Sequence, residues 1–131
     1  MEIKCGIDMI EVTRIQESIE QLGMKFLKRV FTDNEIEYCE SKKTMRYESY
    51  AARFAAKEAV IKAISTDVEN KYEIAFNEIE ILKENNGRPS VNIMGKALDI
   101  IKKNKVISID VSLAHLKEYA IASVNLICDK K

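Results

Sequence analysis

The chain has 131 residues, 47% of them hydrophobic, and its 21 basic and 21 acidic residues give a formal net charge of zero. This length and composition predict a single domain over residues 1–131 with a hydrophobic core, and the neutral balance argues against binding to nucleic acid or to a membrane. No hydrophobic run reaches the roughly 18 residues that a membrane-spanning helix needs. Cys5, Cys39 and Cys128 match no zinc or disulfide spacing, so a cytoplasmic protein with reduced thiols is predicted.

The charges are unevenly distributed along the chain. Residues 42–62 carry six basic and two acidic side chains, whereas residues 63–84 carry six acidic and two basic ones. A local basic surface suits a phosphorylated ligand or an acidic protein partner.

The N-terminal residues have the alternation of a strand. Residues 2–8 predict a half-buried strand with Ile3, Cys5 and Ile7 on the side that faces the core. Asp8 closes this strand and is expected to face away from the core.

Two capping-box spacings predict the starts of helices. Thr13 followed by Gln16 begins an amphipathic helix, and Gly23 is expected to break or kink it. Thr32 with Glu35 has the same spacing and begins a short helix.

The central stretch, residues 48–64, is rich in alanine and free of glycine and proline, which predicts a helix that is apolar nearly all round. Glu58 and Lys62 lie four residues apart on a face shared with small residues. The pair fits an ordinary helical ion pair, or else Glu58 holds a metal or moves a proton while Lys62 binds an anion. Arg53 and Lys57 form a second pair on another face.

The second half of the chain predicts two hairpins separated by a helix. The expected elements are strands at 77–82 and 90–93, a helix at 95–104, and strands at 106–114 and 119–127. Residues 65–76 lose this periodicity and predict an exposed loop. The order of elements predicts an α+β domain in which helices pack against a mostly antiparallel sheet.

Several polar residues allow both a structural and a functional interpretation. Asp8 and Glu58 are candidates for a shared Mg²⁺ site, because this ion prefers one or two carboxylates, although Asp8 alone also fits a turn or cap. His115 fits a hydrogen-bonded residue at the rim of the domain or a catalytic group. The 87–89 turn could approach a phosphate through its backbone N–H groups, or serve only as a hairpin turn.

Five short motifs follow one another along residues 3–124. They are Gly6-Ile7-Asp8 with Glu11 and Arg14; Phe31-Thr32 with Glu35; Arg53 through Ala59 with Lys62 and Ala63; Gly87-Arg88-Pro89; and Val111-Ser112-Leu113 with His115, Tyr119 and Ala120. In order and spacing this set resembles the holo-acyl-carrier-protein synthases, the small type of 4'-phosphopantetheinyl transferase. The resemblance implies the fold of that family and its reaction in fatty acid biosynthesis: Mg²⁺-dependent transfer of 4'-phosphopantetheine from coenzyme A to a serine of apo acyl carrier protein, which releases adenosine 3',5'-bisphosphate.

The resemblance also implies roles for individual residues. Asp8 and Glu58 would be the metal ligands and, with Lys62, the catalytic residues. The residues implied to bind coenzyme A are Arg53, Lys57, Lys62, Gly87, Arg88, Pro89 and His115. The serine's proton would leave through a metal-positioned water or through Glu58, and both routes stay open.

The family resemblance further implies partners. Members of the family form homotrimers with active sites between subunits, and the acyl carrier proteins that they modify are acidic. A homotrimer and an acidic carrier protein are therefore expected here. Arg14, Lys25, Lys28 and Arg29 are the implied contacts to the carrier protein.

The chain departs from the family pattern at two places. The segment 65–74 lacks the usual glycines, and Ala114 and Leu116 flank His115 where the family commonly has a serine and an acid. An alternative function is therefore a weakly active or inactive member that binds coenzyme A or a carrier protein as an assembly subunit. A general Mg²⁺-dependent phosphohydrolase is less favoured, because no second carboxylate cluster is visible.

Overall fold

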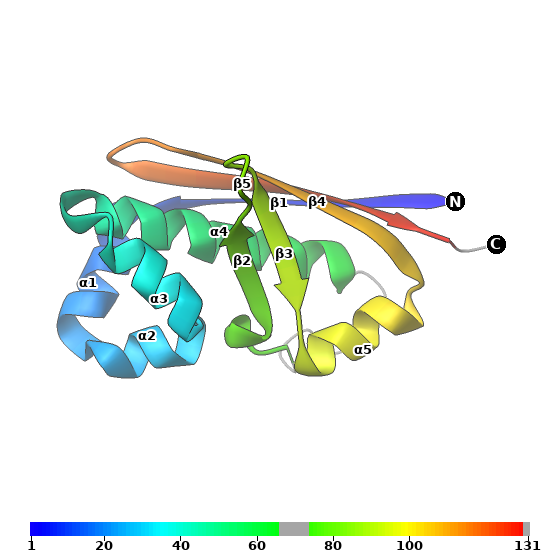
Figure 1. The fold of residues 1–131 in the computed structure, drawn as a ribbon, viewed down its shortest axis with the longest axis horizontal. Coiled ribbons are helices and arrows are strands. Elements are labelled where there is room, and N and C mark those ends of the chain that lie inside the picture. Colours follow the sequence, from blue (N-terminus) through cyan, green and yellow to red (C-terminus); the bar gives the residue numbers. More distant parts are fainter. Residues whose placement is uncertain (66–73, 130–131) are drawn as a thin grey trace.

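The structure, a computed structural model, describes residues 1–65 and 74–129. Its helices and strands in chain order are β1 (Glu2–Glu11), α1 (Val12–Leu22), α2 (Met24–Val30), α3 (Asp33–Glu40), α4 (Arg46–Ile64), β2 (Ile79–Lys83), β3 (Pro89–Ile93), α5 (Gly95–Lys103), β4 (Val106–His115) and β5 (Tyr119–Cys128) (Figure 1). All strand pairs in this part of the chain are antiparallel. The predicted α+β class is confirmed, with two sheets where one was expected.

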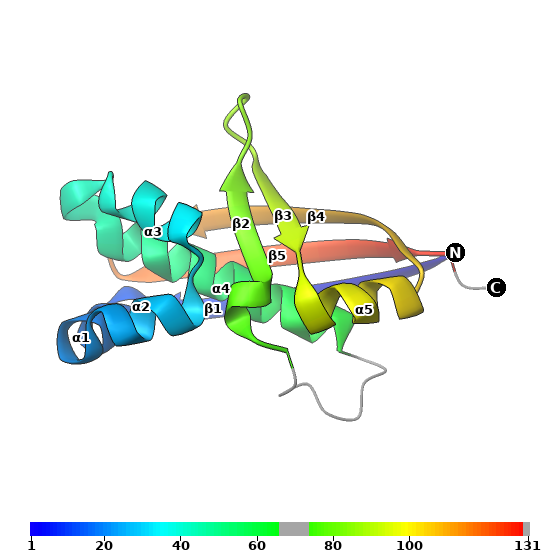
Figure 2. The same cartoon turned by 60° about the horizontal axis from the view of Figure 1, so that its bottom comes forward.

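The helix α4 lies at the centre of the domain. A three-stranded sheet, ordered β1-β5-β4, runs along one side of it, and the separate β2–β3 hairpin crosses it (Figures 1 and 2). The helices α1–α3 gather around the N-terminal half of α4, and α5 lies beyond the hairpin on the other side. Both α4 and the hairpin therefore contribute residues to the hydrophobic core.

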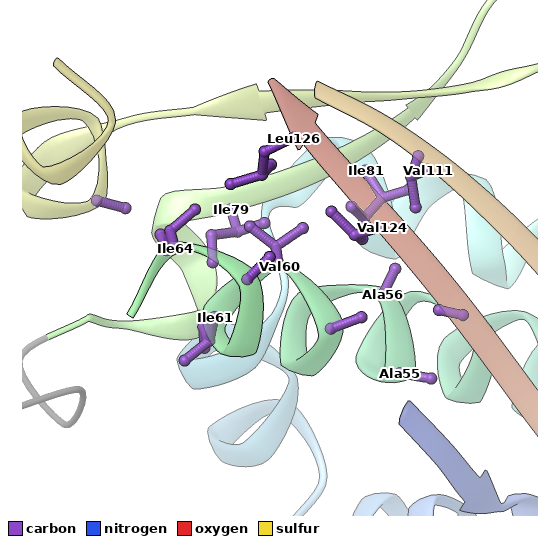
Figure 3. Packing of buried hydrophobic residues seen from close by; sticks show 14 of the residues in the cluster. Ala55, Ala56, Val60, Ile61, Ile64, Ile79, Ile81, Val111, Val124 and Leu126 are labelled. Carbon is purple, nitrogen blue, oxygen red and sulfur yellow. The ribbon is translucent and has the colours of Figure 1, made fainter. Parts of the chain in front are cut away.

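Small residues allow the other elements to approach α4 closely. Ala51, Ala55, Ala59 and Ala63 recur at intervals of four, and none of them is exposed to solvent. Larger side chains from the helix, the hairpin and the sheet fill the space between these elements: Val60, Ile64, Ile79, Ile81, Val124 and Leu126 (Figure 3). The prediction of a central helix that is apolar on nearly all sides is confirmed.

The predicted orientation of the first strand is wrong. Ile3 and Ile7 are 72% and 59% exposed, whereas Lys4 and Gly6 are buried. A Cβ atom at Gly6 would overlap the carbonyl oxygen of Ala59, so glycine is what lets the strand backbone lie against α4 on this side. Asp8, two residues further along, consequently faces the helix side, and the apolar side of β1 faces outward.

The two capping-box predictions had different outcomes. The box formed by Thr32 and Glu35 is confirmed, with both reciprocal hydrogen bonds present. The box predicted at Thr13 is wrong, because α1 begins at Val12. The backbone N–H of Val12 donates to the carbonyl oxygen of Glu118 at 2.9 Å, so a contact from the β4–β5 turn pairs one donor of the first helical turn.

Both predicted hairpins are confirmed, and β3 begins at Pro89, one residue before the predicted start. The helix α4 ends at Ile64, and residues 66–73 of the predicted glycine-free loop lie outside the described residues. None of the helices within residues 1–65 and 74–129 combines the length and hydrophobicity that a membrane-spanning segment needs.

Candidate active site

Lys62 joins the central helix to the first strand. Its ammonium Nζ donates to Asp8 Oδ1 at 3.1 Å and to the backbone oxygen of Ile7 at 2.9 Å. Asp8 and Lys62, two of the three predicted catalytic residues, are therefore in direct contact although they are 54 positions apart in the sequence.

Glu58 lies four residues before Lys62 on α4, so the two side chains are on the same face of the helix. Gly6 packs over Ala59, and β1 then runs toward the N-terminal end of α4, because strand and helix are antiparallel (Figure 1). Helical side chains tilt toward the N-terminus of their helix, so Glu58 and Lys62 both lean toward the part of β1 that carries Asp8. Asp8 and Lys62 thus meet at one edge of the β1–α4 contact, and Glu58 lies on the face of α4 that carries Lys62.

The donor chemistry at this edge fits a magnesium ion. The Asp8 side chain is 19% exposed and Glu58 is half-buried, so neither carboxylate is sealed in the core. Among the described residues, no cluster of three or more His, Cys, Asp or Glu side chains is close enough to form a complete protein ligand set. Mg²⁺ needs only one or two carboxylates, since it retains water and takes oxygen ligands from phosphates, whereas a structural zinc site needs four protein ligands.

A cavity of about 360 Å³ is lined by four of the six other residues predicted to bind coenzyme A. Arg53 from α4, Gly87 and Pro89 from the tip of the β2–β3 hairpin, and His115 from the end of β4 all line it. Its size is within the range of small-molecule sites. Segments far apart in the sequence therefore form one ligand-sized hollow.

Arg53 is the most informative residue of this cavity. It is only 6% exposed, its Nη1 donates to Ser49 Oγ at 3.3 Å, and its guanidinium lies 4.0 Å from the centre of the Tyr38 ring. Its Nε is buried and has no hydrogen-bond partner within the described part of the protein. Since buried donors are nearly always paired, this N–H calls for an acceptor from outside the protein, either a water molecule or an anionic ligand in the cavity.

The surroundings of Tyr38 show that the cavity is positively charged. Burial raises the pKa of the Tyr38 hydroxyl, but the charges of Arg53, Lys42 and Lys83 lower it, and the net shift is downward. Lys42 and Lys83 line the cavity together with Arg53. Three cations facing one hollow favour an anionic ligand.

His115 has an acidic partner that its sequence neighbours do not reveal. Ala114 and Leu116 are apolar, yet His115 Nδ1 lies 3.2 Å from Oε1 of Glu48, in the first turn of α4. Glu48 thus brings a carboxylate next to His115, although Leu116 follows the histidine in the sequence where the family commonly has an acid. The only sequence signal for this contact is an isolated acid near the start of the central helix.

Lys57 was expected to bind coenzyme A, but the structure places it in the core. Its side chain is fully buried, and its Nζ pairs with Glu35 Oε1 at 2.6 Å and donates to the backbone oxygens of Phe76, at 3.1 Å, and Ile79. These partners occupy the three N–H groups of an ammonium. Burial lowers the pKa of Lys57 below its ordinary value, against the opposing effect of Glu35. We therefore do not retain Lys57 as a ligand contact.

Arg88 is also absent from the cavity lining within the described chain. Its Nη2 lies 3.7 Å from Asp110 Oδ2 on β4, and both side chains are largely exposed. The hairpin tip therefore contributes its flanking residues, Gly87 and Pro89, to the cavity.

The residues expected to contact a carrier protein lie on α1 and α2, at one end of the molecule (Figure 2). Arg14, Lys25, Lys28 and Arg29 are all exposed, and Lys28 Nζ pairs with Asp33 Oδ1 at 2.8 Å. We call these four residues the basic surface of α1 and α2.

Comparison with known proteins places the chain in a family. Residues 4–124 match the model of the 4'-phosphopantetheinyl transferase superfamily. The holo-[acyl-carrier-protein] synthase of Ruminiclostridium cellulolyticum is 52% identical over 122 residues, covering 93% of this chain and 90% of that protein.

Solved structures show the same fold. The Helicobacter pylori holo-[acyl-carrier-protein] synthase in complex with coenzyme A has a TM-score of 0.78 and 31% identity, covering 94% of this chain and 99% of that one. The ACPS–CoA complex of Chronobacterium ammoniagenes has a TM-score of 0.86 and 26% identity, covering 99% and 100%. Together with the geometry of the site, these matches show that the chain belongs to the 4'-phosphopantetheinyl transferase superfamily.

Proposed function

We propose that this protein transfers 4'-phosphopantetheine from coenzyme A to a serine of an apo acyl carrier protein, giving the holo carrier protein and adenosine 3',5'-bisphosphate. The observation that carries the proposal is the unpaired, buried Nε of Arg53 in a positively charged cavity, on the same helix as Glu58 and Lys62. The helix α4 thus carries a candidate anion-binding residue, Arg53, and two candidate catalytic residues, Glu58 and Lys62. The relatives named above support the assignment of coenzyme A and the carrier protein as substrates.

The residues of the cavity would hold the nucleotide end of coenzyme A. Arg53 would donate its unpaired N–H to a phosphate, and His115, oriented by Glu48, would line the same hollow. Gly87 and Pro89 bring backbone to the opposite wall. Such fixed contacts supply the positioning on which phosphoryl-type transfer depends.

The edge between β1 and α4 would hold the reacting pyrophosphate. Asp8 and Glu58 would bind Mg²⁺, which supplies positive charge to the pyrophosphate oxygens. Lys62 would donate to the same phosphates from the position in which it now contacts Asp8. Its compact ammonium suits a phosphate contact.

The direct test is to mix the protein with apo acyl carrier protein, coenzyme A and Mg²⁺. Mass spectrometry should show one phosphopantetheine added to each carrier molecule. Absence of a mass gain with several carriers, from protein shown to be folded, would refute the transferase. Calorimetric binding of coenzyme A without transfer would instead favour the assembly-subunit alternative.

Replacing Arg53 with alanine should raise KM for coenzyme A by about 10- to 100-fold while kcat changes little, because a charge-assisted contact to the bound phosphate is lost. If the lost contact is to the ribose 3'-phosphate, KM for coenzyme A lacking that phosphate should hardly change. Arg46→Ala is the matched control, since Arg46 lies on the same helix outside the cavity lining. Equal effects of R53A on both substrates would show that Arg53 contacts another phosphate of coenzyme A.

The outward face of the three-stranded sheet would form the contacts of a homotrimer. Ile3, Ile7 and Met9 of β1 and Tyr119 of β5 are about half or more exposed there. A run of exposed apolar side chains on a folded domain marks an interaction surface. In the described part of one subunit, Asp8 does not line the ligand cavity. A second copy of the chain would therefore help to enclose coenzyme A between the cavity and the β1–α4 edge that carries Asp8.

Ile7→Glu should convert the trimer to monomers, because three like charges would be brought into an apolar contact. Light scattering coupled to gel filtration measures the mass directly. Leu22→Glu, at a similarly exposed apolar position on α1, should leave the mass unchanged. Identical masses for wild type and I7E would exclude this face as the trimer contact.

The basic surface of α1 and α2 would dock the acidic carrier protein. Contacts between exposed charges chiefly govern the association rate and its salt dependence, so KM for the carrier should rise with ionic strength.

The three cysteines are free thiols, which is in keeping with a reducing compartment, and we place the enzyme in the cytoplasm.

A further inference from the structure

The buried ion pair between Lys57 and Glu35 ties three separate elements together. Glu35 Oε1 also accepts from the backbone N–H of Thr32, and its Oε2 accepts from the backbone N–H of Ile81 at 2.9 Å. Lys57 donates to the backbone oxygen of Ile79. The pair therefore binds β2 at two backbone positions and joins it to α3 and α4.

A neighbouring carboxylate extends this network to the second strand of the hairpin. Glu80 is buried and accepts hydrogen bonds from Thr32, from Asn34 at 3.3 Å and from Asn92 on β3 at 3.3 Å. Burial raises the pKa of Glu80, but these donors and the charge of Lys57 lower it, and the net direction is downward. Both strands of the hairpin are thus held by charged groups at its base.

The hairpin needs such an attachment. Within the described chain, β2 and β3 pair only with each other, and an isolated pair of strands is marginally stable. Packing of Ile79 and Ile81 in the core adds stability, but apolar contact is non-directional. Hydrogen bonds to the backbone at both residues fix the position of β2 along its own axis.

This position matters for the ligand cavity. Leu82, Lys83, Gly87 and Pro89 of the hairpin form part of its wall, and Arg53, one turn before Lys57 on α4, forms another part. A shift of the hairpin would change the distance between these walls. We infer that Lys57 and Glu35 are positioning residues that set the shape of the ligand cavity by fixing the hairpin against α4. The identity of the ligand, coenzyme A, rests on the proposed function.

The first test does not depend on activity. Amide hydrogen exchange would be compared between the hairpin and the β1–β5 pair in Lys57→Met, which keeps an unbranched side chain, one atom shorter than lysine, and removes the charge. Exchange in the hairpin should accelerate by about tenfold or more beyond the change that the β1–β5 pair shows. Leu126→Ala is the control, because it opens the core from β5 and leaves the network intact.

The second test uses kinetics at a temperature where all variants are folded. Lys57→Met should raise KM for coenzyme A by about tenfold with kcat within about threefold of wild type, since the contacts are retained but displaced. Leu126→Ala, assayed at a temperature as far below its own Tm as the Lys57→Met assay is below the Tm of that variant, should keep the wild-type KM. Glu35→Gln should change KM and hairpin exchange in the same direction by less, and it supplies both readouts if Lys57→Met does not fold.

The inference is overturned if hairpin exchange changes only in step with global stability, or if Leu126→Ala raises KM as much as the network variants do. Should wild-type protein show no transfer at all, the proposed function fails, while hydrogen exchange and calorimetric titration with coenzyme A still decide the role of Lys57.

Discussion

Asp8→Asn is expected to lower kcat for phosphopantetheine transfer by about 100- to 1,000-fold, with little loss of stability. Asparagine keeps the size of the side chain and an oxygen that can accept from Lys62, but it removes the carboxylate charge that Mg²⁺ prefers in a protein ligand. The effect is measured by mass spectrometry of the carrier protein at saturating coenzyme A over a range of Mg²⁺ concentrations. Glu58→Gln should behave in the same way.

The control for this experiment is Asp99→Asn, an equivalent change on the exposed side of α5, away from the β1–α4 edge. It should retain wild-type kcat. If Asp8→Asn keeps more than about a tenth of the activity, Asp8 is not part of the metal site. Thermal unfolding of each variant separates lost chemistry from lost structure.

Gly6→Val should destabilise the protein by about 3 kcal/mol or more and abolish most of its activity. A Cβ atom at Gly6 would overlap the carbonyl oxygen of Ala59 and lie 3.1 Å from the backbone nitrogen of Ala63. These are backbone atoms of α4, so β1 itself would have to move. That movement would carry Asp8 away from the helix, so both stability and kcat should fall.

Gly23→Ala provides the comparison for this prediction. Gly23 has a φ of +57° and a ψ of −135° between α1 and α2, and an added Cβ would meet no atom within 4 Å, so only backbone strain of about 1–3 kcal/mol is expected. Urea unfolding gives both values. A Gly6→Val variant no less stable than Gly23→Ala would show that β1 does not depend on close approach to α4.

Local features of the sequence were sufficient for most of the fold. Helix periodicity, the Thr32 capping box, the break at Gly23 and the turns of both hairpins depend on interactions between residues a few positions apart. The start of α1 was missed because its first N–H is paired by Glu118, more than a hundred residues away.

The sequence by itself determined the elements, their order and the residue types of the site, because periodicity, capping and turn chemistry are short-range and the family motifs are linear. Only the tertiary structure decided which side of each element is buried. Alternation in β1 cannot tell which side meets α4, and the absence of a Cβ at Gly6 outweighs the hydrophobicity of Ile3 and Ile7. The burial of Lys57 was also decided by the tertiary structure. A lysine on a helix is predicted to be solvent-exposed, and only the fold shows Glu35 beside it. Close approach and long-range charge pairing depend on the packing of distant segments, which no local pattern specifies.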